Sequence, residues 1–455
     1  MSLAQEGLKA KIKTHTKLIL VDEAHPLILL ANHIPWESLA NLVYDDLKNT
    51  TKKGFWMVGR KLYMRTHLGI YFLKARTKKT DRDIISEIHD NPVYQAFCGS
   101  TVIQKWQCPH PTKIEEFRSR LSPEIKAKCN EILVQMAVRM GCGDPTCLDV
   151  DSTVQVANIS YPTDAGLILK LAEKCKKIKD AFHLNINFNL KEIRTYARNY
   201  FFRSKRLACD KVGTLLSSYY TIVKNNVMPI VKFAETRMKE SKLRLKWNLK
   251  KNVIQVATFA RKYLKDVACY VREHKANKGK RLSIHAQEVA CITKGKTGKK
   301  YEFGRVFQLG RIGGNFLTAI CSGINLPDKK AMTPLIENHE NIFGKGVLKS
   351  LSSDKGYYSK KNIMMAQKRC ALQVGIQRPG PKNIMLTKKE AALQESLRCR
   401  RAGIEPLIGH AKRFGLGRSK MKNDRNTHGS GFTAIMGFNL SQLERKLKVG
   451  MPKVA

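Results

Sequence analysis

The strongest constraint on the fold of this 455-residue chain is that its strand-forming segments lie far apart in the sequence. β-Branched and polar residues alternate over residues 148–159, and strand patterning returns at 301–309 and near 316–320. Residues 166–295 lie between them and have the apolar spacing of helices. If the strands share one sheet, this helical stretch must leave the sheet and return to it as an insertion. We therefore expect an α/β fold, a mixed sheet with flanking helices.

The net charge of the chain indicates a polyanionic partner. The chain has 83 Lys and Arg against 37 Asp and Glu, a formal net charge of +46, which is self-repelling unless an anion neutralises it. Residues 166–295 alone have 30 Lys and Arg against 9 Asp and Glu. A membrane-surface protein would concentrate this charge in one amphipathic segment or tail, and ribosomal or packaging proteins are usually short or low in complexity. The spread of charge favours a long nucleic-acid surface.

The helical and strand patterns divide the chain into four regions. Short helices with basic faces are expected before residue 125, including one that begins near Trp36 and one that Thr80 caps. Such helices suit a DNA reader of the helix-turn-helix kind, although their periodicity fits any small helical domain. The predicted regions are an all-helical N-terminal DNA-binding domain (1–125), the first part of a catalytic domain (126–165), a basic helical insertion (166–295) and the second part of the catalytic domain (296–455).

Apolar runs and cysteines bear on the cellular location. The longest apolar runs fall far short of the roughly 20 residues of a membrane-spanning helix, and the first residues do not have the pattern of a secretory signal. The twelve cysteines are scattered over the chain, which is typical of reduced thiols and not of a disulfide framework. We expect a cytoplasmic protein with no membrane partner.

Three acidic residues have the placement that phosphodiester chemistry requires. Asp151 lies in the first strand, Asp354 follows a short strand expected at 346–352, and Glu405 lies in a helical pattern that begins at Lys388. Two strands and a flanking helix can bring distant carboxylates together at one end of a sheet. Such carboxylates can hold two divalent cations roughly 4 Å apart, one beside the attacking oxygen and one beside the leaving oxygen.

Asp149 is the main alternative to Asp151, because it lies two residues earlier on the same face of the strand. The Ser-Thr-Val that directly follows Asp151 favours the later aspartate. A single aspartate in a strand is more often structural than catalytic, so the prediction depends on the three acids together.

Several motifs resemble those of DDE-type transposases of bacterial insertion sequences. Residues 401–412 have the Arg-x3-Glu-x6-Lys spacing of the signature that surrounds the catalytic glutamate in many of these enzymes. Four further segments resemble the IS-five-like group: Asp151-Ser-Thr-Val with Tyr161-Pro-Thr-Asp164, Asp354-Lys-Gly-Tyr-Tyr-Ser359, Asn91-Pro-x-Tyr-Gln-x-Phe-Cys-Gly99 and Phe117-Arg-x-Arg-Leu121. The resemblance covers about residues 20 to 445.

This resemblance implies an RNase H-like catalytic domain in which Asp151, Asp354 and Glu405 are catalytic and bind two Mg²⁺ (or Mn²⁺) ions. It also implies that Arg401 and Lys412 contact DNA phosphates near the cut. The implied enzyme binds the terminal inverted repeats of a mobile element, cleaves phosphodiester bonds at the element ends and joins the 3′ hydroxyl to target DNA. A homodimer on double-stranded DNA, associated with the bacterial nucleoid, would hold the two ends together. The signature often has Tyr where this chain has Arg398.

Two other functions fit the same residues: a related metal-dependent nuclease that cuts without joining, and a catalytically idle DNA-binding regulator.

Trp247 lies in the basic insertion, where an exposed indole would stack on an unpaired base, and packing on the insertion's own core is an equal alternative. Residues 290–297 match a permissive phosphate-loop pattern without its flanking elements. Cys142 and Cys147 do not have a common zinc spacing. We predict neither an ATP site nor a zinc site.

Overall fold

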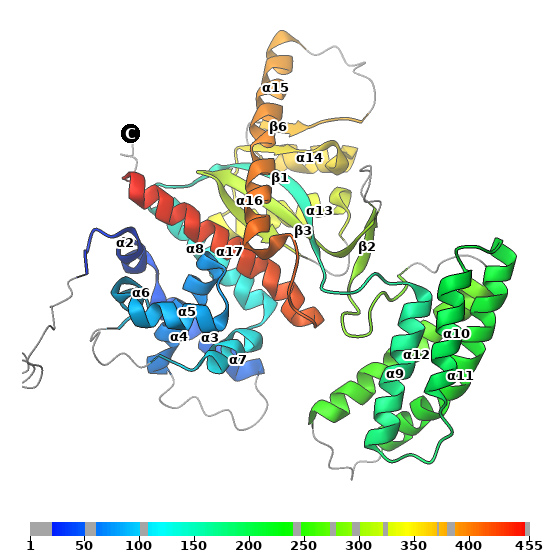
Figure 1. Cartoon of the computed structure of the whole chain (residues 1–455). Helices are drawn as coiled ribbons and strands as arrows, with labels where there is room; N and C mark the ends of the chain where they lie inside the picture. Colours follow the sequence, from blue (N-terminus) through cyan, green and yellow to red (C-terminus); the bar gives the residue numbers. More distant parts are fainter. Residues whose placement is uncertain are drawn as a thin grey trace, which may run out of the picture.

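The computed structural model describes residues 21–50, 61–100, 108–239, 247–273, 279–293, 301–321, 326–370, 373–379 and 387–450 (Figure 1). The helices before the first strand are α2 (Pro26–His33), α3 (Trp36–Thr50), α4 (Lys61–Thr77), α5 (Asp81–Asp90), α6 (Pro92–Phe97), α7 (Pro111–Arg120) and α8 (Pro123–Arg139). Those of the insertion are α9 (Asp164–Ala181), α10 (Leu190–Arg203), α11 (Cys209–Lys239) and α12 (Trp247–Glu273). The later helices are α13 (Asp328–Phe343), α14 (Lys360–Arg369), α15 (Lys388–Ala402), α16 (Ile404–Ala411) and α17 (Asp424–Val449), with short turns η2 (Lys355–Tyr357) and η3 (Lys412–Leu416).

One mixed sheet is assembled from distant parts of the chain. Its strands are β1 (Asp144–Val156), β2 (Ala290–Thr293), β3 (Tyr301–Gly313), β4 (Phe316–Ile320), β5 (Ser350–Ser353) and β6 (Gln373–Ile376). The order is β2-β3-β1-β5-β6, and β4 also pairs with β3. β3 is antiparallel to β1, β2 and β4, whereas β5 is parallel to both β1 and β6. The expected mixed α/β architecture is confirmed, and the sheet is consistent with an RNase H-like domain.

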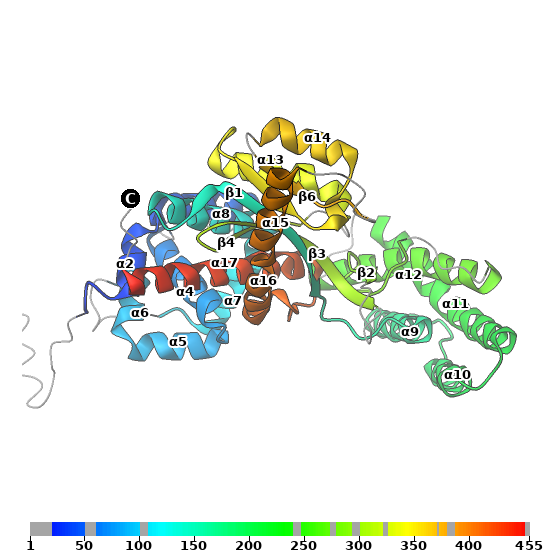
Figure 2. The same cartoon turned by 90° about the horizontal axis from the view of Figure 1, so that it is seen from above.

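The alternation of side chains along β1 defines two faces of the sheet. Leu148 and Val150 belong to the hydrophobic core that α13 and α14 cover. Leu309, which lies opposite Asp151 in the β1–β3 register, belongs to the core on the other face, under α16 and α17. Figure 2 shows α13 and α14 on one side of the sheet and α16 and α17 on the other. Asp151 therefore lies on the face that α16 and α17 cover.

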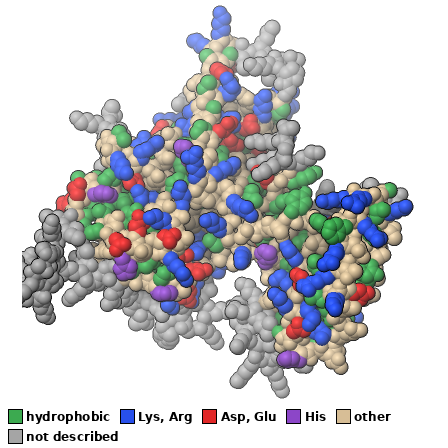
Figure 3. Space-filling view, in the orientation of Figure 1, with side chains coloured by type: hydrophobic (Ala, Val, Ile, Leu, Met, Phe, Trp, Pro, Cys, Tyr) green, Lys and Arg blue, Asp and Glu red, His purple; other side chains and the backbone are tan. Residues whose placement is uncertain are grey.

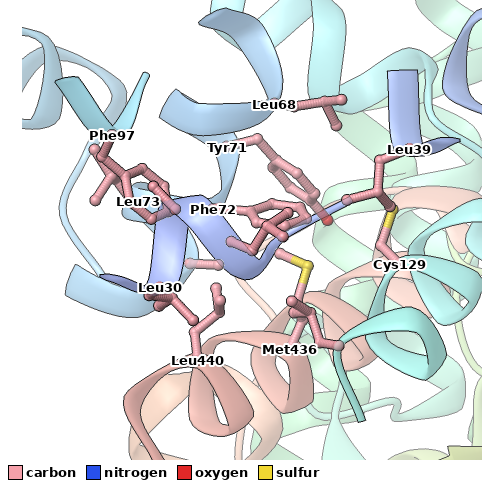
Figure 4. Close-up of a cluster of buried hydrophobic side chains, with 14 of the residues drawn as sticks. Leu30, Leu39, Leu68, Tyr71, Phe72, Leu73, Phe97, Cys129, Met436 and Leu440 are labelled. Atoms are coloured by element: carbon pink, nitrogen blue, oxygen red, sulfur yellow. The ribbon is translucent and has the colours of Figure 1, made fainter. Parts of the chain in front are cut away.

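The N-terminal helices share a hydrophobic core with α17 (Figure 4). Met436 and Leu440 of α17 pack among side chains of α2, α4 and α8, such as Leu30 and Phe72. α17 also contributes to the core beneath the sheet, so one helix joins the two cores. A Cβ atom at Gly437 would lie 2.3 Å from the carbonyl oxygen of an α4 residue, so only glycine permits this close helix contact. The predicted boundary at residue 125 falls within α8, inside this continuous core.

Helices α9 to α12 pack on a hydrophobic core of their own, to one side of the sheet (Figures 1 and 2). Tyr219 and Tyr263 are fully buried there, and their hydroxyls donate to the start of α9, at the carbonyl of Ala165 and the carboxylate of Asp164. The structure thus has helices through most of residues 166–295. Its last part differs from the prediction, because residues 290–293 form β2 and pair with β3.

Local signals in the sequence correctly predicted where two of the N-terminal helices begin. α3 begins at Trp36, and Thr80 caps α5 through a reciprocal pair of hydrogen bonds with Asp83. The sequence pattern also predicts a strand at 384–386, which lies outside the described residues, and the strand described before α15 is β6. Among the described helices, none is long and apolar enough to cross a membrane.

Candidate active site

Asp151 and Asp354 lie side by side on adjacent parallel strands. In the β1–β5 register, Val150 lies opposite Ser353, so the next residue on each strand is one of the two aspartates. β5 ends at Ser353, and the Asp354 carboxylate accepts the following backbone N–H at 2.7 Å as the cap of η2. The Asp151 carboxylate also accepts the following backbone N–H at 2.7 Å. The sheet thus brings together two acids that are about 200 residues apart in the sequence.

Glu405 is connected to this pair through Arg401. Glu405 lies in the first turn of α16, and Arg401 lies in the last turn of α15. One guanidinium nitrogen of Arg401 donates to the Glu405 carboxylate at 2.9 Å, and another lies 3.6 Å from the Asp151 carboxylate. This contact joins Arg401 and Glu405 across the break between α15 and α16. The Glu405 side chain is 61% exposed, compared with 21% for Asp151.

Asp149, the alternative aspartate, is buried and accepts hydrogen bonds from other side chains of the protein. It is 1% exposed and accepts hydrogen bonds at 2.7 Å from both the Ser352 hydroxyl and the Arg400 guanidinium. Arg311 lies 3.4 Å from its other oxygen. Because these protein groups already occupy its oxygens and it is almost fully buried, Asp149 is less accessible to a ligand than Asp151, whose side chain is 21% exposed.

The Asp149 network also fixes the position of α15 on the sheet. Arg400 donates to the Ser350 hydroxyl at 2.7 Å, and Arg311 donates to the Arg400 carbonyl at 2.8 Å. A Cβ atom at Gly403 would lie 2.3 Å from the Arg311 guanidinium, so a side chain at this position would displace Arg311 from its contacts with Asp149 and Arg400. We did not predict Arg311 or Arg400 from the sequence, because only tertiary contacts distinguish them from the many other cations.

Electrostatics couples the three carboxylates. The pKa of Asp151 is raised from 3.8 to about 6, mainly by burial and to a smaller extent by the charges of Asp354 and Glu405. The N–H of Ser152 and the charge of Arg401 act in the opposite direction. Because burial is the largest cause, the net upward shift shows mainly that ionisation of Asp151 is unfavourable in its partly desolvated position.

Carboxylate oxygens are the ligands that Mg²⁺ and Mn²⁺ prefer. Asp151 and Asp354 fit such an ion by their adjacency and by their mutual repulsion, which a cation would relieve. Across the part of the chain that the structure describes, no three His, Cys, Asp or Glu residues form a group ready to hold a metal ion. To complete the set of three, the exposed Glu405 side chain must rotate away from Arg401 toward the aspartates.

Two family models match the chain. A transposase domain (DUF772) matches residues 17–120, and a transposase DDE domain matches residues 271–440, which include Asp354 and Glu405. The chain belongs to the DDE-type transposases. Neither match assigns this transposase to the IS-five-like group. An uncharacterised protein, ORF8 in the nfe locus of Rhizobium meliloti, is 28% identical to it over 156 residues, which are 33% of this chain and 71% of that protein. No solved structure matches the transposase.

The residues predicted to bind DNA have different environments in this transposase. The Arg401 side chain is 18% exposed and lies between two carboxylates, whereas Lys412 is exposed at the start of η3. Trp247 begins α12, but its side chain lies outside the described residues. The second half of the phosphate-loop-like segment, residues 294–297, also lies outside them. Cys142 is buried and Cys147 is half-buried, as expected for ordinary thiols.

Proposed function

We propose that this transposase cuts DNA at the ends of a mobile element and joins the 3′ hydroxyl to target DNA, with Asp151, Asp354 and Glu405 holding two Mg²⁺ or Mn²⁺ ions. One observation carries this proposal: Asp151 and Asp354 are adjacent at the end of β5, and Arg401 connects Glu405 to Asp151. An RNase H-like sheet is the frame that we propose for this arrangement, with two carboxylates on central strands and the third on a helix that crosses the sheet.

The three carboxylates, Arg401 and Lys412 would have separate roles in this reaction. Divalent ions bound here supply activation of the attacking oxygen and stabilisation of the leaving oxygen. Asp151 and Asp354 would hold them on two hydrogen-bonded strands, so the sheet sets their spacing. Glu405 would approach from the helical side, and Arg401, once released from Glu405, would face a DNA phosphate. Lys412 would contact the same strand roughly 10 Å farther along the helix. The same arrangement serves water and a sugar hydroxyl equally, so one site suffices for cleavage and joining.

Double-stranded DNA is the proposed partner. The net charge of +46 requires a polyanion, and Lys and Arg side chains are spread over the face of the molecule seen in Figure 3. The N-terminal helices would bind the terminal inverted repeats, since residues 17–120 match a transposase domain of their own. A homodimer would hold the two element ends together.

Metal-dependent cleavage of labelled DNA that contains an element end tests this proposal. The wild type is expected to nick the end in Mg²⁺ and not in EDTA, and to transfer the nicked strand to a target plasmid. Changes in the second shell of a metal site already cost about 10–100-fold, so Asp354→Asn should reduce both steps by at least about 100-fold. Asp144→Asn makes the same change at an exposed position at the start of β1, outside the N-terminal helices, and should leave both steps unchanged.

Each alternative outcome has a definite meaning. Full strand transfer by Asp354→Asn would refute the assignment of the carboxylates. Nicking without strand transfer would identify a nuclease, and specific end binding without metal-dependent nicking would identify a DNA-binding regulator.

A further inference from the structure

A basic groove lies between the C-terminal end of α4, the end of α16 and α17. It has a volume of 290 Å³, and the described residues that line it include four basic side chains and two aromatic rings, but none with a carboxylate. These six residues are Lys78, His410, Arg413, Arg445, Phe414 and Phe438. Lys78, His410, Arg413 and Arg445 are exposed. A concave surface with several cations and no acid attracts an anion.

Close helix packing places Lys78 in the groove. Because Gly437 lets α17 approach the end of α4, the chain that follows α4 reaches the aromatic rings of the groove. Lys78 has a φ of 62°, a left-handed conformation that is uncommon for a residue other than glycine. Its ammonium group lies 4.9 Å from the centre of the Phe414 ring, and that ring packs edge-on against Phe438. The Phe414 ring, supported by Phe438, therefore holds the Lys78 ammonium group in the groove through a cation–π contact.

Arg413 lies in a π-helical turn that is tied to the catalytic strand. The turn η3 includes Gly415 with a φ of 114°, which favours glycine. The Gly415 carbonyl accepts a hydrogen bond of 2.8 Å from Gln155 of β1, the strand of Asp151. Since β1 holds both η3 and Asp151, the groove and the carboxylates have a defined separation.

The groove and Glu405 share the solvent-facing side of α16. Ile404, Leu407 and Ile408 face the core, whereas Glu405 and His410 are exposed. At 1.5 Å per residue, His410 lies about 8 Å and Arg413 about 12 Å beyond Glu405 along the helix axis. A DNA strand rises about 3.4 Å per nucleotide. A strand that passes Glu405 therefore reaches the groove after about two to four nucleotides.

We propose that this groove binds backbone phosphates of the DNA strand about two to four nucleotides from the bond that is cut, and thereby sets the register of that strand at the carboxylates. This inference rests on the proposed function. Arginine offers paired donors to phosphate, and lysine offers a mobile point charge. The half-buried Phe414 ring would support the sugar between two phosphates.

Neutralisation of single phosphates tests the groove. Element-end DNA is prepared with one methylphosphonate at a time, placed at each position within six nucleotides of the cut on either strand. For the wild type, a neutral group two to four nucleotides from the cut should weaken binding on the order of 10-fold. The Arg413→Ala/Arg445→Ala variant should bind unmodified DNA more weakly, show no further weakening from a neutral group at that position, and cut at scattered positions. The binding of this variant should also depend less on salt. The slope of the logarithm of the binding constant against the logarithm of the salt concentration should decrease by about one for each phosphate that the two arginines neutralise in the wild type.

A second double variant provides the matched control. Lys345→Ala/Lys349→Ala removes two exposed cations from the segment before β5, at the opposite end of that strand from Asp354. This variant should keep the wild-type response to every methylphosphonate and the wild-type cutting position. Unchanged thermal unfolding of both variants would show that they are folded.

Failure of the inference can be distinguished from failure of the proposed function. If the wild type neither binds nor cuts element ends, both are refuted. If the wild type binds and cuts but the groove variant responds to every neutral phosphate as the wild type does, the groove inference alone is refuted. The same holds if the groove variant cuts at the wild-type position with wild-type affinity.

Discussion

The chain has two basic helical regions that look alike in sequence but differ in how they are attached to the sheet. Helices α2 to α8 share a hydrophobic core with α17, and α17 also packs beneath the sheet. Helices α9 to α12 pack around their own core. The first region is thus part of the body that holds the carboxylates, whereas the second is a unit that the chain enters after β1 and leaves before β2. The helical pattern of the sequence is the same in both regions, because it shows that a helix has an apolar face. It does not show which other element that face packs against.

The two regions differ in how closely they are packed against the elements that hold the carboxylates. A change among the N-terminal helices can reach Glu405 through α17 and the core under α16, whereas helices α9 to α12 have a separate core and are joined to the sheet by the segments after β1 and before β2. Each of the following substitutions tests this difference, in order of expected effect on stability.

Phe259→Ala should destabilise the insertion by about 3–5 kcal/mol, because it removes a large side chain from a filled core. Phe259 is 1% exposed and stacks on Tyr263 with the ring centres 5.0 Å apart. Hydrogen exchange should show faster exchange in α9 to α12 and unchanged protection in β1, β3 and α17. Equal loss of protection in the sheet would contradict the separation of the two regions.

Gly437→Ala should destabilise the body that holds the site by about 1–3 kcal/mol, because the added methyl group overpacks the α4–α17 contact. Protection from hydrogen exchange should fall in α4, α17 and β4 together, while α9 to α12 keep theirs. Loss of protection in α4 alone would show that the N-terminal helices are an independent domain after all.

Asp151→Asn should abolish DNA cleavage and yet stabilise the same body by about 1–2 kcal/mol at pH 7.5 in metal-free buffer. The pKa of Asp151 is about 6 in the folded protein and near 3.8 in the unfolded chain, so its ionisation opposes folding above pH 4. The advantage of the variant should be complete above pH 6 and disappear as the pH falls to 4. Thermal unfolding from pH 4 to 8 measures it, and an advantage that grows at low pH would contradict the electrostatic account.

Gly409→Ala should stabilise the protein by about 0.5–1 kcal/mol, because alanine restricts the unfolded chain and favours the helix. A Cβ atom at this exposed position of α16 would have no other heavy atom within 4 Å. The substitution is the matched control for Gly437→Ala, since the two make the same chemical change. A lower melting temperature would show that the solvent-facing side of α16 is packed against something.

Much of the site could be predicted from the sequence because its signals are local. The strand around Asp151, the short strand before Asp354 and the helical spacing of Arg401 and Glu405 all depend on neighbouring residues. The strand order and the role of Asp149 could not be predicted in the same way. Asp149 and Asp151 share a strand face and differ only in their partners, which come from Ser352 and Arg400, more than 200 residues later.

The sequence by itself determined the mixed α/β class, the expectation of a polyanionic partner, the starts of helices such as those at Trp36 and Thr80, and the three carboxylates that we propose as catalytic. These follow from charge, periodicity and capping, which act within a few residues. Only the tertiary structure decided that the N-terminal helices are built around α17, that Asp151 and Asp354 are neighbours, and that Lys78, Arg413 and Arg445 line one groove. Each of these arrangements depends on which apolar faces, distant in the sequence, pack together. The free energy of such packing depends on both partners, so the sequence of one segment does not determine it.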